Sequence, residues 1–210
     1  MIKILIADDH AIIREGLKQI LAETSDMVVA GEAADGREVL DQVRKDDYDL
    51  VLLDIAMPGR GGLDTLRQLK HEKPELPVLV LSMYPEEQYA IRAFKAGVSG
   101  YLTKESAPEE LISAIRKVTQ GGKYVSSSLA EKLAFNLETD TEEPLHEKLS
   151  DREYEVMIMI ASGKTVKEIA DKLSLSVKTI STNRVRALKK MGMKNNAEIT
   201  YYAIKQGLVP

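Results

Sequence analysis

Five polar residues in the first half of the chain stand where hydrophobic segments end. Each follows a run of about four to six largely apolar residues, as is typical of strands buried on both faces of a parallel sheet. Polar groups gather at the carboxyl ends of such strands, so three carboxylates, a hydroxyl and an ammonium group are predicted to meet in one crevice. This combination indicates a site that handles phosphate. The five residues are Asp8, Asp9, Asp54, Ser82 and Lys104.

The elements that must position these residues alternate through residue 121. Each apolar run is followed by a segment with helical periodicity, and this repeated order predicts a parallel sheet with helices on both faces. Leu111, Ile115 and Val118 form the stripe of the last helix, which Pro108 precedes. The strands are expected at 2–7, 27–33, 50–53, 78–81 and 100–102.

Length and composition exclude several classes of protein. A chain of 210 residues favours two compact units joined by a linker, and the absence of cysteine excludes disulfides, thiolate catalysis and sulfur metal sites. No apolar run reaches the roughly 18 residues of a membrane span, and the N-terminus lacks the pattern of a signal peptide. We therefore expect a cytoplasmic protein with no membrane partner.

Charge divides the chain into parts of opposite sign. Residues 1–125 carry 16 Lys+Arg and 21 Asp+Glu, residues 126–147 carry 1 and 6, and residues 148–210 carry 12 and 6. The three net charges are therefore −5, −5 and +6. A basic part behind an acidic front part predicts that only the C-terminal part meets a polyanion.

The C-terminal part is expected to be helical, behind a tether that is ordered only in part. Ser150 and Glu153 have the spacing of a capping box at the start of its first helix. A short helix at 164–173 and a basic helix at 177–191 then form the pattern of a helix-turn-helix, and a last helix begins near Asn196. The predicted buried side of the basic helix is Val177, Ile180, Leu188 and Met191.

Both halves of the chain resemble one known family. Asp8-Asp9-His10, the segment Leu53-Asp54-Ile55-Ala56-Met57-Pro58-Gly59, Ser82 and Lys104 resemble the receiver domain of two-component response regulators. The segments 149–156, 166–170 and 176–181 resemble the LuxR-type DNA-binding domain. Together they resemble the NarL/FixJ class of regulators.

The resemblance implies an α/β fold and three segments. A receiver domain with a doubly wound, five-stranded parallel sheet of the flavodoxin-like kind is expected at 1–122. A partly helical linker is expected at 123–146, with a short helix through Leu129, Leu133 and Leu137. A smaller, all-α helix-turn-helix domain is expected at 147–210.

The resemblance also assigns roles in the receiver. It implies that Asp54 accepts the phosphoryl group and that Ser82 and Lys104 bond its oxygens. Tyr101 stands in the place of a switch residue, although a half-buried strand tyrosine is an equal interpretation. The expected cofactor is Mg²⁺, held by Asp9, Asp54 and the main-chain carbonyl of Ala56, with Asp8 holding a water of the ion.

Two residues near this set depart from the expected roles. Receivers commonly have a proline after the lysine, in a cis peptide, whereas Glu105 follows Lys104 here, so the geometry of this peptide is left open. His10 is interpreted as a loop residue outside any metal cluster, because His71 and His146 lie in other predicted elements.

The basic helix supplies the expected DNA contacts. Six basic residues and no acidic one lie between 174 and 194, which fits contact with phosphates. Lys178 and Thr179 are expected to hold the DNA backbone. Ser181 and Val185 stand where relatives often have lysines, so a base contact by either is left open. The candidates for the groove are Lys178, Thr179, Ser181, Thr182, Val185, Arg186 and Lys189.

The implied partners follow from the same resemblance. A sensor histidine kinase would supply the phosphoryl group, double-stranded DNA would be the target, and RNA polymerase would be a further partner. A homodimer is expected on phosphorylation, through Ala197, Tyr201 and Ile204 of the last helix.

Two other functions compete with a phosphorylation-dependent regulator. One is a DNA-binding regulator that does not depend on phosphorylation, against which the intact set of five polar residues speaks. The other is a Mg²⁺-dependent aspartyl-phosphate phosphatase, but the second acid of that signature is replaced by Ala56. We expect no enzymatic activity other than self-phosphorylation from small phosphodonors and self-dephosphorylation, both at Asp54.

Overall fold

The structure, a computed structural model, describes residues 1–57, 61–126, 129–131 and 144–209 and divides into two compact units. The first unit spans Met1–Leu133 and the second Ala134–Pro210. No helix of the described residues is long and apolar enough to cross a membrane. The predicted linker residues Leu133 and Leu137 lie outside the described residues, as do Pro58 and Gly59.

The first unit contains a five-stranded sheet in the order β2-β1-β3-β4-β5, in which every pairing is parallel. This architecture confirms the predicted α/β fold, and the strands begin where the apolar runs predicted. The strands are β1 (Ile2–Ala7), β2 (Met27–Ala33), β3 (Leu50–Leu53), β4 (Val78–Ser82) and β5 (Gly100–Thr103).

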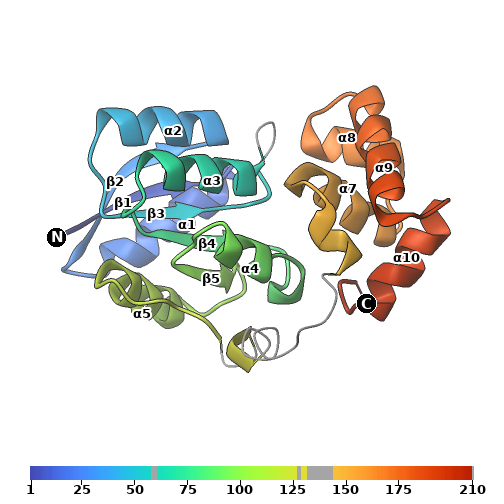
Figure 1. Cartoon of the computed structure of the whole chain (residues 1–210). Helices are drawn as coiled ribbons and strands as arrows, with labels where there is room; N and C mark the ends of the chain where they lie inside the picture. Colours follow the sequence, from blue (N-terminus) through green and yellow to red (C-terminus); the bar gives the residue numbers. More distant parts are fainter. Residues whose placement is uncertain (58–60, 127–128, 132–143, 210) are drawn as a thin grey trace. The chain divides into compact units, whose positions relative to one another are not determined.

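Five helices cover the two faces of this sheet (Figure 1). Alternation along the strands sends Ile4, Ile6 and Leu52 to one face, where they pack against α1 and α5 in a fully buried core. The helices α2 and α3 contact each other on the opposite face, and α4 contacts β5. The helices are α1 (Ala11–Ala22), α2 (Gly36–Lys45), α3 (Gly62–Glu72), α4 (Glu86–Lys95) and α5 (Pro108–Thr119).

A glycine allows α3 to start close to the end of β3. A Cβ atom added at Gly62 would lie 2.2 Å from the Cα of Ile55 and 2.7 Å from the carbonyl oxygen of Asp54. Only a residue without a side chain permits this approach. The position of the Asp54 backbone therefore depends on Gly62, a residue outside the polar set.

The start of the tether belongs to the first unit. Tyr124 forms a parallel bridge with Gly100 and donates a hydrogen bond from its hydroxyl to Glu110 at 2.9 Å. Ser126 donates a short hydrogen bond to Glu86, at the beginning of α4, and Leu129 is buried. The chain after α5 thus continues along the edge strand β5 before it reaches the residues that the structure does not describe.

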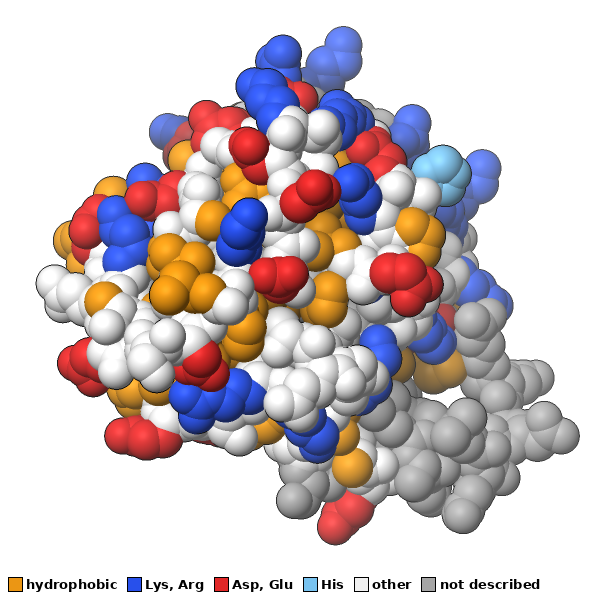
Figure 2. All heavy atoms as spheres, turned by 90° about the vertical axis from the view of Figure 1, so that its left-hand side faces the viewer, with side chains coloured by type: hydrophobic (Ala, Val, Ile, Leu, Met, Phe, Trp, Pro, Cys, Tyr) orange, Lys and Arg blue, Asp and Glu red, His pale blue; other side chains and the backbone are white. Residues whose placement is uncertain are grey.

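The surface of the molecule seen in Figure 2 mixes the two signs of charge. Lys and Arg side chains alternate there with Asp and Glu, and hydrophobic side chains lie between them. Scattered apolar groups of this kind are normal on protein surfaces. The net charge of the front part is therefore not concentrated on this face.

The second unit is helical, and side-chain caps define where its helices begin. Ser150 and Glu153 form the predicted capping box, and Thr165 with Glu168 forms a second one at the start of α8. Ser176 caps α9 through the backbone N–H of Thr179. The elements are the 3₁₀ helix η1 (Leu145–Lys148), α7 (Asp151–Ala161), α8 (Val166–Leu173), α9 (Val177–Met191) and α10 (Asn196–Lys205).

The predicted buried side of the basic helix is wrong at one position. Ile180, Leu188 and Met191 are buried in the unit, whereas Val177 is 51% exposed. Val177 is the first residue of α9, directly after its N-cap, so it lies at the exposed end of the helix. Asn183 takes the inward position instead and donates a hydrogen bond to the carbonyl of Thr179.

Candidate functional site

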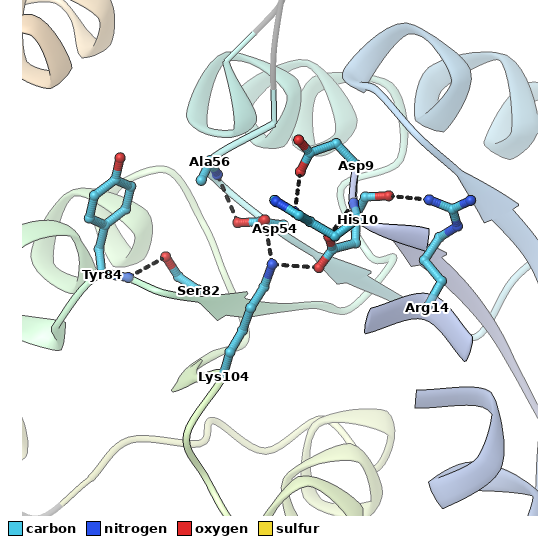
Figure 3. A network of polar contacts seen from close by, with 9 residues as sticks. Asp9, His10, Arg14, Asp54, Ala56, Ser82, Tyr84 and Lys104 are labelled. Carbon is cyan, nitrogen blue, oxygen red and sulfur yellow. Dashed lines mark hydrogen bonds and ion pairs between the residues drawn. The ribbon is translucent and has the colours of Figure 1, made fainter. Parts of the chain in front are cut away.

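Asp54 lies at the carboxyl end of β3 and is held at both oxygens. Its Oδ1 accepts a hydrogen bond from the backbone N–H of Ala56 at 2.8 Å, and its Oδ2 accepts one from the Nζ of Lys104 at 2.6 Å (Figure 3). The side chains of Asp54 and Lys104 are 1% and 4% exposed. The pair therefore joins two strand ends that are 50 residues apart in the sequence.

Lys104 also contacts Asp8, at 2.5 Å from Oδ2, and Asp9 lies beside this group with its side chain 28% exposed. Ligand atoms of Asp8, Asp9 and Asp54 lie within 4.8 Å of one another. Three carboxylates facing one ammonium group leave two negative charges in excess. A buried excess of this size matches the charge of one divalent cation.

The two central groups shift each other's protonation. Burial raises the pKa of the Asp54 carboxyl, and the charge and hydrogen bond of Lys104 oppose that shift. Burial also acts to lower the pKa of Lys104, but attraction to Asp54 and Asp8 outweighs it and raises the pKa above its ordinary value. Lys104 therefore stays protonated, and a cation beside Asp54 would favour the ionised carboxylate.

Ser82 is the last residue of β4 and is fully buried. Its Oγ accepts a hydrogen bond from the backbone N–H of Tyr84 at 3.0 Å. The carbonyl of the same Tyr84 accepts a hydrogen bond from the hydroxyl of Tyr101 at 2.9 Å. The interpretation of Tyr101 as half-buried is wrong, because its side chain is fully buried.

His10 belongs to the polar group, contrary to its interpretation as a residue outside any cluster. Its Nδ1 lies 3.0 Å from the Oδ1 of Asp9 and 3.3 Å from the Oδ1 of Asp8. Asp8 and Asp9, which directly precede His10 in the sequence, make these contacts. The group therefore forms without His71 and His146. The four residues that could together hold a metal ion are Asp8, Asp9, His10 and Asp54.

The structure decides the peptide geometry after Lys104, which the sequence left open. No peptide bond of the described residues is cis, including the bond between Lys104 and Glu105. The backbone N–H of Lys104 donates to the carbonyl of Ser82, so β4 and β5 stay paired up to the site.

The exposed side of α9 carries most of the predicted groove residues. Val185 is 57% exposed, and Ser181 is the least exposed of them because it is half-buried. The hydroxyl of Thr179 is hydrogen-bonded to the hydroxyl of Ser176, the N-cap residue of α9, at 2.8 Å. The exposed members are Lys178, Thr179, Thr182, Val185, Arg186 and Lys189.

Two of the six basic residues between 174 and 194 form side-chain hydrogen bonds within the second unit. Lys190 donates to the buried Glu153 at 2.6 Å, and Arg184 donates to Asn196 at 2.6 Å. Burial acts to raise the pKa of Glu153, but the hydrogen bonds from Lys190 and Ser150 together outweigh it and lower the pKa. Glu153 offsets the charge of Lys190, so the count of six overstated the charge that this region presents to a polyanion.

The predicted dimer residues lie on one face of α10. Tyr201 is 71% exposed and Ile204 is 52% exposed, and Ala197 is exposed one turn earlier. Residues four and three apart share a helix face, so the three form one apolar stripe. An open hollow beside it is lined by Met193, Asn195, Ala197, Glu198, Tyr201, Tyr202 and Lys205.

A doubly wound sheet with this acidic pocket, followed by a helix-turn-helix unit, defines a phosphorylation-regulated transcription factor. Residues 4–116 match the family model for the response regulator receiver domain, and residues 147–203 match the model for bacterial regulatory proteins of the luxR family. The chain therefore belongs to the response regulators that join a receiver to a LuxR-type DNA-binding domain.

Individual relatives extend over nearly the whole chain. Response regulator UvrY of Escherichia coli (strain K12) is 36% identical over 99% of this chain and 96% of its own length. Response regulator GacA of Pseudomonas aeruginosa is 36% identical over 100% and 98%. The structure of RcsB from Salmonella typhimurium is similar with a TM-score of 0.71 and 29% identity over 98% of both chains. RcsB bound to promoter rprA with phosphomimetic BeF3⁻ matches with a TM-score of 0.66 and 29% identity, over 96% of this chain and 97% of that one.

Proposed function

We propose that Asp54 accepts a phosphoryl group from the phosphohistidine of a sensor histidine kinase and that this modification controls DNA binding by α9. The observation that carries the proposal is the grouping of Asp8, Asp9, Asp54 and Lys104 at the ends of three strands. The membership of the chain in the response regulators supports the same function.

The transfer needs no general base to remove a proton from the nucleophile. An aspartate is ionised at neutral pH when nearby positive charge offsets its burial, so an Asp54 oxygen can attack phosphorus directly. The bond from phosphorus to the donor's imidazole nitrogen breaks as the new bond to oxygen forms. Lys104 already lies 2.6 Å from Asp54 and is placed to pair with a phosphoryl oxygen.

The pocket fits Mg²⁺, the cofactor that the family implies. The Oδ1 atom of Asp9 is buried and accepts no hydrogen bond from the described residues, as an atom reserved for a cation would be. Asp9, Asp54 and the carbonyl of Ala56 would hold the ion, with Asp8 holding one of its waters. When bound, Mg²⁺ supplies the charge that neutralises the phosphoryl oxygens.

The peptide of Tyr84 is the proposed link from the phosphoryl group to the surface. To bond a phosphoryl oxygen, Ser82 must give up the hydrogen bond that it accepts from Tyr84, and the loop at 83–85 then loses that contact. The hydrogen bond from the Tyr101 hydroxyl to the carbonyl of Tyr84 does not involve Ser82. The signal is therefore proposed to move the loop and the start of α4.

The output is proposed to be a dimer on DNA. Lys178, Arg186 and Lys189 would contact phosphates together with Thr179, and Ser181, Thr182 and Val185 would face the groove. The apolar stripe of α10 would pair across a twofold axis, which requires half-sites about one helical turn apart. RNA polymerase is the further proposed partner at the promoter.

The decisive experiment follows phosphate and DNA binding together. Acetyl phosphate with Mg²⁺ should modify one aspartate, Asp54, and should raise both the sedimentation coefficient and the affinity for operator DNA. The Asp54→Asn variant should lose all three responses, and Asp64→Asn on the surface of α3 is the matched control. Unchanged phosphodonor-stimulated DNA binding by Asp54→Asn would exclude this mechanism.

A further inference from the structure

The side chain of Arg14, near the start of α1, extends back to the turn that carries two carboxylates of the pocket. Its Nη1 donates a hydrogen bond to the main-chain carbonyl of Asp8 at 2.8 Å (Figure 3). Its Nε donates to the Oε2 of Glu32, on the neighbouring strand β2, at 3.0 Å. The Arg14 side chain is only 18% exposed. One guanidinium group therefore joins the turn after β1 to β2.

The partner of Arg14 on β2 is itself held in place. Lys18, one turn further along α1, donates to the other carboxylate oxygen of Glu32 at 2.8 Å. The hydrogen bonds from Lys18 and Arg14 lower the pKa of Glu32, so this carboxylate is ionised at neutral pH. An ionised partner makes charge-assisted hydrogen bonds, which are shorter and stronger than neutral ones. Arg14 is therefore fixed at both of its contacts.

The carbonyl that Arg14 binds belongs to the peptide that joins Asp8 to Asp9. The N–H on the other side of Asp8 donates to the carbonyl of Ala33 at 3.1 Å. Because a peptide group is planar, fixing its carbonyl also fixes the direction in which the chain enters Asp9. The Asp9 side chain has little support of its own, since its buried Oδ1 accepts no hydrogen bond from the described residues. The position of this carboxylate therefore depends on the backbone that Arg14 holds.

Resting on the proposed Mg²⁺ site, we propose that Arg14 is a positioning residue of the receiver, which directs the Asp9 carboxylate at the cation by holding the Asp8–Asp9 peptide. Arg14 acts through the main chain, because its hydrogen bonds go to the Asp8 carbonyl and to Glu32 and not to the carboxylates of the pocket. Residues that orient metal ligands in this way typically change metal affinity by about 10–100-fold.

A purely electrostatic role of Arg14 predicts the opposite effect. A guanidinium group near the pocket repels a divalent cation, so its removal would strengthen Mg²⁺ binding. Loss of the hydrogen bond to the Asp8 carbonyl would instead leave Asp9 misdirected and weaken Mg²⁺ binding. The sign of the change in Arg14→Met therefore separates the two roles.

The test is a calorimetric Mg²⁺ titration of the full-length variants. Arg14→Met should weaken Mg²⁺ binding by about tenfold or more. In the Mg²⁺-free protein the same variant should speed hydrogen exchange at the backbone N–H of His10, which donates to the Oδ1 of Asp8. At saturating Mg²⁺ its rate of phosphorylation by acetyl phosphate should return to that of the unchanged protein, which a general loss of structure would not allow.

Two further variants complete the design. Lys18→Met removes the other cation that binds Glu32 without touching the Asp8 carbonyl, so it should leave the Mg²⁺ affinity unchanged. Arg14→Lys keeps the charge but lacks the planar fork of N–H donors that binds two acceptors at once. It should weaken Mg²⁺ binding by a smaller factor than Arg14→Met, and it serves as the test if Arg14→Met does not fold.

Each other outcome has a defined meaning. Unchanged or tighter Mg²⁺ binding in Arg14→Met overturns the inference. Equal losses in Arg14→Met and Lys18→Met also overturn it, because the loss then comes from a general disturbance of α1. If Asp9→Asn loses Mg²⁺ while Arg14→Met does not, the inference fails and the proposed Mg²⁺ site stands. If Asp9→Asn keeps its Mg²⁺ affinity, the proposed site fails, and the inference fails with it.

Discussion

Replacement of Lys104 by methionine tests the centre of the site, because it keeps most of the side-chain volume and removes the charge. Lys104 is 4% exposed and pairs with Asp8 and Asp54, which are 2% and 1% exposed. Removing one partner of a buried ion pair costs about 3–5 kcal/mol, since the charges that remain are uncompensated. At about 4 °C per kcal/mol for a unit of this size, the melting temperature should fall by roughly 12–20 °C.

The chain contains a matched control for this substitution. Lys18 also bridges two carboxylates, Glu15 at 2.5 Å and Glu32 at 2.8 Å, but it is 31% exposed. Solvent screens such a pair, so Lys18→Met should cost far less stability than Lys104→Met. The two variants therefore differ in burial and not in the number of carboxylates.

The assay is thermal unfolding of the full-length variants with and without Mg²⁺. Lys104→Met leaves three carboxylates without a cation, so Mg²⁺ should bind it more tightly and raise its melting temperature more than that of the unchanged protein. Equal losses of stability in Lys104→Met and Lys18→Met would refute the reasoning. So would a Mg²⁺ effect no larger in Lys104→Met than in the unchanged protein.

Three further predictions concern packing, DNA contact and pH. Gly62→Ala should lower the free energy of unfolding in urea by about 1–3 kcal/mol, whereas Gly16→Ala, with open space around the added carbon, should be neutral or stabilising. Lys189→Ala should reduce the salt dependence of DNA affinity by about one unit of slope, whereas Lys190→Ala should mainly destabilise the unit. Hydrogen bonds from Arg44 and Gln68 lower the pKa of Glu72 from 4.5 to about 2. The ionised Glu72 therefore stabilises the fold above pH 4.5, and this contribution is lost as the pH falls toward 2. In melting curves, Glu72→Gln should remove this loss of stability at acid pH.

Contrary results would be informative in each case. An unaltered free energy of unfolding in Gly62→Ala would mean that α3 can move away from the end of β3. Identical salt slopes for Lys189→Ala and the unchanged protein would remove Lys189 from the DNA interface. Acid melting curves of Glu72→Gln that match those of the unchanged protein would mean that its ion pair adds nothing to stability.

Local patterns were strong enough to predict the elements of both units. The short apolar runs, alternating with segments of helical periodicity, indicated buried strands. Ser150 and Glu153 form the capping box of α7, as their spacing indicated. The second capping box, at Thr165 and Glu168, has the same spacing and could have been found in the same way. Val177 was wrongly predicted to be buried, because helical periodicity does not show which end of a helix is exposed to solvent.

The functional residues were predictable as a set, but their partners were not. The sequence by itself determined that the five polar residues end buried strands, because hydrophobic runs and side-chain alternation are local properties. Only the tertiary structure decided that Lys104 lies between Asp8 and Asp54 and that Lys190 pairs with Glu153. Those pairings depend on distances between segments brought together by packing, and such distances are not encoded in any short stretch of the chain.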